Sequence, residues 1–218
     1  MSENKDKTAP QNFSSLRQGS TDSRAVEAYY DGWAQSYDET LSNWRYSAPD
    51  DAAESLAPLL QAGQSVLDVG CGTGLFAKAL RARIDCRVTG LDISTASLKI
   101  AEETGAYAGV RQHDLQQMPL PLGDNTMDAA GCVGVMTYIE DVGGLLRDLC
   151  RIVRPGGPIL FTQRDDLWQA KGLDAILERL QADGLTAPAQ VVGPLPYLPD
   201  NEDFREDIRV YHVLLRCS

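Results

Sequence analysis

Apolar residues recur with two different periods along the chain, and the alternation between the two periods predicts an α/β fold. Helical spacing, with apolar side chains every three or four residues, is found at 25–37, 49–63, 75–83, 94–105, 142–153 and 173–182. Short apolar runs typical of buried strands lie at 65–69, 87–92, 109–113, 127–133 and 159–162. This order is typical of crossover connections, so we expect these strands to form a mostly parallel sheet with helices on both faces.

The last third of the chain has a different pattern. After the helical stretch at 173–182, prolines at positions 188, 194, 196 and 199 predict a loop. Residues 208–215 then alternate between apolar and polar side chains, as a strand does. Because proline cannot donate a hydrogen bond to a central ladder, we expect the Pro-rich segment and the final strand to form an antiparallel hairpin at the edge of the sheet.

The first residues differ from the rest in composition. Residues 1–22 are rich in Ser, Thr, Gln, Asn and Lys, and only Phe13 and Leu16 offer large apolar side chains to bury. Burial of so little apolar surface does not offset the entropy lost on ordering, so we expect a disordered tail. The remaining residues, 23–218, suffice for one hydrophobic core, and we expect a single domain there.

Charge and cysteine content narrow the classes of function. The chain has 31 acidic and 20 basic side chains, a net charge of -11, and no dense Lys/Arg cluster, so nucleic acid is disfavoured as a partner. Its five cysteines form no C-x-x-C motif, and no His/Asp/Glu cluster suggests a metal. Because no signal peptide or membrane-spanning stretch is visible, we expect a cytoplasmic protein without membrane contact, and we infer no obligate protein partner.

The most informative segment joins the first buried strand to the next helix. Residues 68–74 read D-V-G-C-G-T-G, with glycine at every second position after an acid. We expect bare backbone N–H groups at this turn, where a ligand can approach closely. The spacing differs from the G-x-G-x-x-G dinucleotide fingerprint, and the acid suits an ammonium group better than a pyrophosphate. The alternative is a tight strand–helix turn that binds nothing.

Two further acids follow the next two strands. Asp92 ends the second strand, about 20 residues after the glycines, where Rossmann-type folds place the acid that binds ribose hydroxyls. Ser94 is available to cap the helix that follows. Asp114 follows the third strand and is a candidate acceptor for an adenine amino group. An aspartate at such a position is more often a turn residue.

Together these segments resemble the class I S-adenosylmethionine (SAM)-dependent methyltransferases. The motifs that carry this resemblance are LDVGCGTG at 67–74, LDIS at 91–94, HDL at 113–115 and RPGG at 154–157. A finer resemblance is to the methyltransferase-like proteins of the Williams-Beuren syndrome chromosome region and their bacterial relatives. It is carried by YDGWAQSYD at 30–38, WRYSAP at 44–49, TYIED at 137–141 and FTQRDDL at 161–167. The resemblance implies a Rossmann-like seven-stranded sheet with an antiparallel last strand, in agreement with the hairpin inferred above.

The resemblance also implies SAM as cofactor and S-adenosylhomocysteine (SAH) as product. It places Asp68 near the methionine moiety, Asp92 at the ribose, and Tyr37 and Trp33 above the cofactor. For Trp33, packing in the core is an equal alternative, because aromatic residues at helical spacing usually serve a core. The candidate cofactor-binding residues are Trp33, Tyr37, Asp68, Gly70, Cys71, Gly72, Gly74, Leu75, Asp92, Ile93, Ser94, Asp114, Leu115 and Cys132.

Four residues from segments expected to overhang the methyl group are candidates for acceptor binding: Tyr138, Gln163, Arg164 and Tyr197. Among them, Arg164 is a candidate partner for an acceptor carboxylate. Residues 131–134 replace the Asn/Asp-Pro-Pro-Tyr box with which similar enzymes hold a planar amino nitrogen, so methylation of bases and amides is disfavoured.

The attacking atom and the catalytic residue stay open. Neither His113 nor His212 is a convincing general base, because the first adjoins the adenine-side acid and the second lies in the final strand. We expect methyl transfer to a small-molecule acceptor, with O, N, S or C as the attacking atom. The alternatives are a SAM-binding protein without transfer activity and, disfavoured by the glycine spacing, a nicotinamide-dependent oxidoreductase.

Overall fold

The computed structural model describes residues 16–17, 19–204 and 207–218. Its strands are β1 (Ser65–Val69), β2 (Arg87–Asp92), β3 (Tyr107–Gln112), β4 (Ala129–Cys132), β5 (Pro158–Arg164), β6 (Gln190–Pro196) and β7 (Arg209–Arg216). Its helices are α1 (Ser23–Asn43), α2 (Ala48–Leu56), α3 (Leu75–Arg81), α4 (Thr95–Glu103), α5 (Val142–Ile152), α6 (Asp165–Trp168) and α7 (Leu173–Ala182), with 3-10 turns η1 (Ala57–Leu59) and η2 (Met136–Tyr138). The predicted disordered tail falls mainly on residues 1–15 and 18, which lie outside the described residues.

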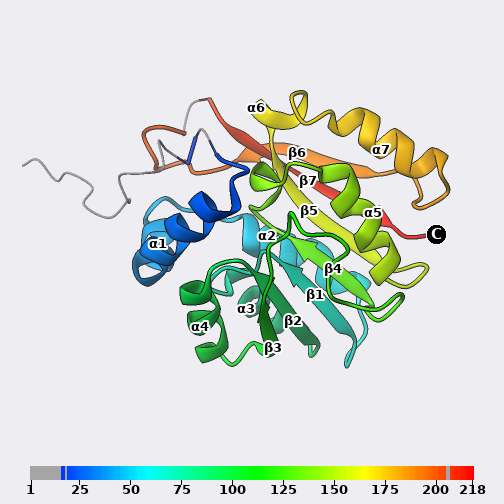
Figure 1. Ribbon diagram of the computed structural model, residues 1–218, viewed down its shortest axis with the longest axis horizontal. Helices are drawn as coiled ribbons and strands as arrows, with labels where there is room; N and C mark the ends of the chain where they lie inside the picture. The colour runs from blue at the N-terminus through cyan, green and yellow to red at the C-terminus, as the bar shows by residue number, and fades with distance from the viewer. Residues whose placement is uncertain (1–15, 18, 205–206) are drawn as a thin grey trace, which may run out of the picture.

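The strands form one seven-stranded sheet in the order β3-β2-β1-β4-β5-β7-β6 (Figure 1). The first five in this order run parallel to one another. β7 runs antiparallel to both of its neighbours, β5 and β6. The predicted Rossmann-like sheet with an antiparallel last strand is therefore confirmed. Strand order reverses between β1 and β4, and open α/β sheets bind ligands beside such a reversal.

Helices cover both faces of the sheet because successive strand residues point to opposite sides. On β1, Val66 belongs to a buried cluster with residues of α2 and α3, whereas Leu67 belongs to a cluster with residues of α5 and α7. The apolar stripe predicted for α5, with Leu145, Leu149 and Ile152, is fully buried. Among the described residues, no helix combines the length and apolar character needed to cross a membrane.

The edge hairpin at the end of the chain is present, but its outer strand lies inside the segment predicted as a loop. β6 includes Pro194 and Pro196 and is exposed along most of its length. Its pairing with β7 is interrupted between Val192 and Leu195. An edge strand needs hydrogen bonds on one side only, so it tolerates prolines that would break a central strand. The prolines therefore mark an edge strand here instead of a loop.

Gly131 of the central strand β4 leaves room for an aromatic ring of α3. A Cβ atom placed on Gly131 would lie 2.3 Å from Cε1 of the buried Phe76. We expect Gly131→Ala to lower the free energy of unfolding by about 1–3 kcal/mol, the usual range for overpacking a core. Chemical denaturation measures this. Gly109→Ala on β3 is the matched control, because a Cβ there meets nothing within 4 Å, and equal losses in the two variants would contradict the explanation.

Candidate functional site

Two adjoining cavities lie at the carboxyl ends of β1, β2 and β4. They share Tyr37, Gly70, Gly72 and Val133, and their volumes are about 630 and 340 Å³. The larger one is also lined by Ser23, Val26, Tyr30, Asp92, Ile93, Asp114, Leu115, Gln116, Gly134, Val135, Tyr138 and Ile139. The smaller one is also lined by Tyr46, Pro49, Asp68, Cys71, Thr73, Leu75 and Phe76. The glycine turn and all three predicted acids thus meet in one site.

The glycine turn has the backbone conformation that its sequence requires. Gly70, Gly72 and Gly74 have φ angles of 70°, 51° and 98°, a region that side chains disfavour. The expectation of bare N–H groups is wrong for most of the turn, because Gly70 and Cys71 donate to the Leu91 carbonyl at 2.7 and 2.9 Å. These bonds fix the turn to the end of β2. The glycines therefore leave space for a ligand to approach the backbone, but they offer it few free N–H donors.

Asp92 holds together the loops that follow β1 and β2. Its Oδ2 accepts a hydrogen bond from the backbone N–H of Gly72 and its Oδ1 accepts one from Ser94, both at 2.8 Å. The side chain is buried, and this burial raises the pKa of the carboxyl, although the hydrogen bonds from Ser94 and Gly72 act in the opposite direction. Each carboxylate oxygen keeps a second lone pair. Asp92 can therefore accept from two ribose hydroxyls at the cavity wall.

Asp68 is the most deeply buried acid of the site. Its residue is 1% exposed, and its carboxylate accepts a hydrogen bond from the Tyr107 hydroxyl at 2.7 Å. Burial raises the pKa of Asp68 to about 7, while the bond from Tyr107 opposes the rise. An ammonium group in the smaller cavity would stabilise the ionised form. The site therefore fits the amino group of a methionine moiety.

Two carboxylates of α1 hold this helix over the cavities. Asp31 accepts hydrogen bonds from the Ser94 hydroxyl at 2.6 Å and from the Ala96 N–H at 3.1 Å, at the start of α4. Further along α1, Asp38 accepts a hydrogen bond from the hydroxyl of Thr73 in the glycine turn. These contacts lie at the loop that follows β2 and at the glycine turn that follows β1. The position of α1 is thus coupled to the loops that it covers.

Four tyrosine side chains line the cavities: Tyr30, Tyr37 and Tyr138 line the larger one, and Tyr37 and Tyr46 line the smaller one. Tyr30 and Tyr37 of α1 pack edge to face at 6.0 Å, and Tyr30 packs against Tyr138 at 5.6 Å between ring centroids. Tyr46 and Tyr197 pack at 5.5 Å. Burial raises the pKa of all five hydroxyls. They are therefore neutral at physiological pH and act as hydrogen-bond groups, not as bases.

The structure brings most of the predicted cofactor residues to the cavities and leaves four elsewhere. Trp33 is 3% exposed in an aromatic cluster, which matches the core alternative. Ser94 caps α4 through the Ser97 N–H. Gly74 is the N-cap of α3, and Cys132 belongs to the core beside α5. Their role as cofactor ligands stays a prediction that the cavity walls do not support.

Of the four residues predicted to bind the acceptor, only Tyr138 lines a cavity. Tyr138 lines the larger cavity, and Tyr197 packs behind it on Tyr46 and Phe204. Gln163 is 1% exposed and donates to the carbonyl of Arg164. Arg164 itself is bound by Asp166 and by backbone carbonyls, so its guanidinium is not aimed into either cavity.

Several lining residues were absent from the sequence-based candidates. Tyr30 and Val26 lie on the apolar stripe of α1, which identified the helix but not the edge of the stripe that faces a ligand. Gln116 follows Asp114 by two residues, and its amide donates to the Tyr138 carbonyl at 2.7 Å. Among the described residues, no group of three or more His, Cys, Asp or Glu side chains is arranged to hold a metal ion.

Comparisons with known proteins agree with this geometry. Residues 67–161 match a family model described as a methyltransferase domain. Human Methyltransferase-like protein 27 is 33% identical over 163 residues, which are 72% of this chain and 66% of the relative. The Serratia marcescens malonyl-[acyl-carrier protein] O-methyltransferase is 33% identical over 156 residues, 67% of this chain and 58% of the relative. A solved chain in the complex between the Haloferax volcanii Trm112 methyltransferase activator and a methyltransferase has a TM-score of 0.67 at 19% identity, covering 88% of this chain and 97% of its own length.

The sheet, the glycine turn and these relatives define the chain as a class I SAM-dependent methyltransferase. Within this class, Methyltransferase-like protein 27 is one of the curated proteins to which it is similar. The expected relation to methyltransferase-like proteins and the expected SAM cofactor are confirmed. The chain spans 58–66% of the length of the two curated relatives above, so the similarity does not assign their substrates to it.

We expect Asp92→Ala to weaken SAH binding at least about tenfold, because hydrogen bonds to a charged group are worth about 1.5–3 kcal/mol. Isothermal calorimetry measures the affinity, and circular dichroism checks the fold. Asp148→Ala is the matched control, since Asp148 is also 9% exposed and also accepts from a backbone N–H, that of Leu120, at a distance from the cavities. Unchanged affinity in Asp92→Ala, or equal weakening in both variants, would contradict the ribose assignment.

The raised pKa of Asp68 predicts a loss of stability as the pH rises. The folded protein retains a proton here up to about pH 7, whereas the unfolded chain releases it near pH 4. Unfolding is therefore favoured increasingly across this interval. In Asp68→Asn, which keeps an acceptor for Tyr107, we expect the free energy of unfolding to fall less between pH 5 and pH 8 than in the wild type.

Chemical denaturation of the ligand-free protein at several pH values measures this difference. Asp85→Asn serves as the control, because the Asp85 side chain is 81% exposed. This control should show the wild-type pH dependence. Parallel curves for the wild type and Asp68→Asn would show that Asp68 is ionised throughout.

Proposed function

We propose that this protein transfers the methyl group of SAM to a small-molecule acceptor that carries no negative charge. When bound, SAM supplies an activated methyl group, which a lone pair of the acceptor receives as the carbon–sulfur bond breaks. The observation that carries the proposal is the pairing of a ribose-type acid, Asp92, with a buried acid, Asp68, on two sides of one glycine turn. This arrangement suits a ligand with both hydroxyl groups and a positive charge.

The charge of the cavity walls limits the acceptor. Among the residues that the structure describes, those that line the two cavities include three aspartates and no Lys, Arg or His. A carboxylate or phosphate acceptor would lack a cationic partner there and would be repelled by the acids. A neutral acceptor, or an amine that attacks in its uncharged form, has no such penalty. The absence of a histidine from the walls further favours an attacking atom that needs no general base.

In this proposal, the residues of the chain act mainly by orienting the cofactor and the acceptor, and less by transferring protons. Asp92 and Asp68 orient the two ends of the cofactor, and the glycine turn allows it to lie against the backbone. Tyr30, Tyr37 and Tyr138 offer aromatic faces and neutral hydroxyls to the acceptor. Holding the reacting atoms close and aligned accounts for much of the rate in such displacements.

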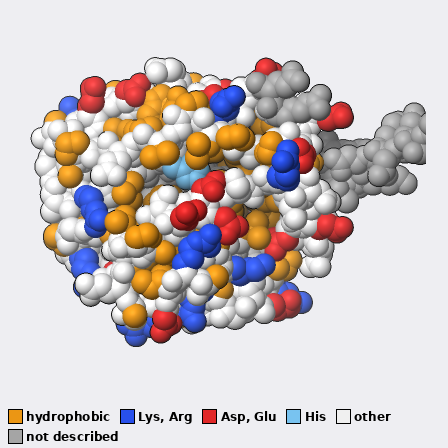
Figure 2. Space-filling view, turned by 180° about the vertical axis from the view of Figure 1, so that it is seen from behind, with side chains coloured by type: hydrophobic (Ala, Val, Ile, Leu, Met, Phe, Trp, Pro, Cys, Tyr) orange, Lys and Arg blue, Asp and Glu red, His pale blue; other side chains and the backbone are white. Residues whose placement is uncertain are grey.

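The surface supports a small acceptor over a nucleic acid. On the face shown in Figure 2, basic and acidic side chains alternate among apolar ones, and the basic side chains form no continuous band. All five cysteines are free thiols, which supports a cytoplasmic location. The structural neighbour solved with an activator protein makes a protein partner worth testing, so the inference of no obligate partner stays a prediction.

A methyl-transfer screen with radiolabelled SAM tests the proposal. Acceptors are supplied as matched pairs that differ in charge, such as phenethylamine and phenylacetate, together with neutral phenols. We expect labelled product from amines or neutral acceptors and none from the carboxylates. Faster transfer to carboxylates would contradict the charge argument. Tight SAH binding with no transfer to any acceptor would favour a SAM-binding protein without transfer activity.

A further inference from the structure

Arg164, at the end of β5, is a buried cation bound by groups from distant parts of the chain. Its side chain is 3% exposed. Nε and Nη2 donate to the two carboxylate oxygens of Asp166 at 3.0 and 2.6 Å. Nη1 donates to the Leu16 carbonyl at 2.8 Å and Nη2 to the Arg17 carbonyl at 2.7 Å. The Phe204 ring lies 5.4 Å from the guanidinium carbon.

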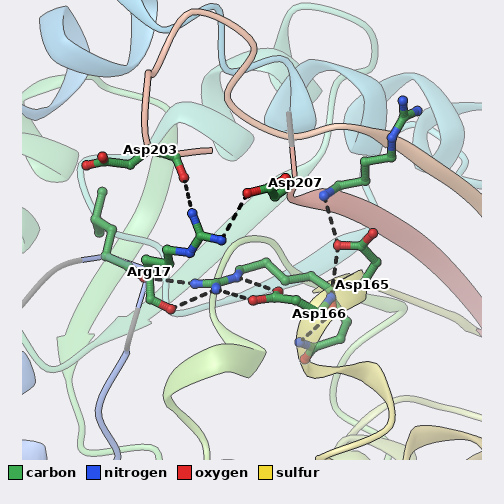
Figure 3. Close-up of polar contacts among 9 residues, drawn as sticks. Arg17, Asp165, Asp166, Asp203 and Asp207 are labelled. Atoms are coloured by element: carbon green, nitrogen blue, oxygen red, sulfur yellow. Dashed lines mark hydrogen bonds and ion pairs between the residues drawn. The ribbon is translucent and has the colours of Figure 1, made fainter. Parts of the chain in front are cut away.

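The segment that Arg164 binds is fixed a second time by Arg17. The Arg17 guanidinium donates to the Asp203 carbonyl at 2.7 Å and to the Asp207 carboxylate at 3.2 Å (Figure 3). Asp203 and Asp207 belong to the loop before β7. Residues near the start of the described chain are therefore held between the end of β5 and this loop.

From Arg164 this segment leads to the cavity wall. We name the described residues 16–17 and 19–22 the strap. Leu16 packs against the aromatic cluster that contains Tyr30, Tyr37 and Tyr197. The Thr21 carbonyl accepts a hydrogen bond at 3.2 Å from Gln116, which lines the larger cavity. Ser23, directly after the strap, also lines that cavity. The strap thus adjoins the aromatic side of the site at both ends.

We propose that Arg164 is a positioning residue that holds the strap closed beside the cofactor and acceptor cavities, so that ligand exchange requires the strap to leave Arg164. This inference rests on the proposed function, since it concerns access to the same cavities. It also gives Arg164 a role different from binding an acceptor carboxylate. The five N–H groups of an arginine suit this role, because they bind a carboxylate and backbone carbonyls at the same time.

The contacts of Arg164 allow the strap to open without leaving a buried charge uncompensated. Asp166 binds the guanidinium from the same short segment, so the ion pair persists whether the strap is bound or not. The bonds to the Leu16 and Arg17 carbonyls form only when the strap is in place. An isolated buried cation would be very costly. A permanently paired cation can instead release and rebind a neutral backbone.

The test measures SAH release from the full-length protein. SAH-loaded protein is mixed with excess SAM in a stopped-flow instrument, and intrinsic tryptophan fluorescence gives the dissociation rate constant. We expect Arg164→Met and Leu16→Gly each to raise this rate constant, Arg164→Met by about tenfold. Because both changes release the same strap, the double variant should be no faster than the faster single variant. Amide hydrogen exchange at Thr21 and Asp22 should accelerate in parallel.

Two further variants separate this role from a general loss of structure. Arg216→Met is the matched control, since Arg216 binds a backbone carbonyl, that of Gly156, far from the strap. It should leave the rate constant unchanged. Arg17→Ala removes only exposed contacts, so it should fold and still raise the rate constant, and it decides the question should Arg164→Met not fold.

Normal SAH affinity with unchanged release rates in Arg164→Met and Arg17→Ala would overturn the strap proposal. Multiplicative effects in the double variant would also overturn it, because they would show that Arg164 and Leu16 act independently. A wild-type protein that bound no SAH would overturn the proposed function together with the strap.

Discussion

One buried carboxylate connects the parts of the molecule on which the site depends. Asp92 accepts backbone N–H groups from Gly72 and Ser94, and so joins the glycine turn after β1 to the start of α4. These bonds add to those that Gly70 and Cys71 donate to the Leu91 carbonyl, which fix the same turn to the end of β2. Asp92 also lines the larger cavity. One side chain thus joins the two loops and lines the cavity between them.

The helix above the site is held by the same kind of interaction. Asp31 and Asp38 of α1 bind polar groups at the start of α4 and in the glycine turn, so that Tyr30 and Tyr37 are presented to the cavity. These carboxylates accept from groups near helix starts, where the helix dipole favours negative charge. The acidic character of the site therefore follows in part from how the fold is held together.

The sequence predicted the strands of the sheet well. It predicted less well which residues of each helix line the cavities. The bounds of β1 and β2 follow from short apolar runs, and Asp92 follows from its distance to the glycines. By contrast, Trp33 and Tyr30 share one apolar stripe, and only the placement of α1 turns Tyr30 to the cavity and Trp33 to the core. The sequence predicts that Arg164 binds an acceptor carboxylate, because no local pattern shows which groups of the protein bind its guanidinium. Its partner carbonyls belong to Leu16 and Arg17, which lie far from it in the sequence.

The described charged residues that line the cavities are all aspartates, and this has a consequence for the proposed reaction. In the proposed reaction the sulfonium of the donor would become the neutral thioether of the product, so methyl transfer would remove one positive charge from a site that contains Asp68, Asp92 and Asp114. Coulomb attraction to these walls is therefore stronger for the donor than for the spent cofactor. In the proposed reaction, this difference would limit product inhibition, because the spent cofactor would be bound less tightly than the donor.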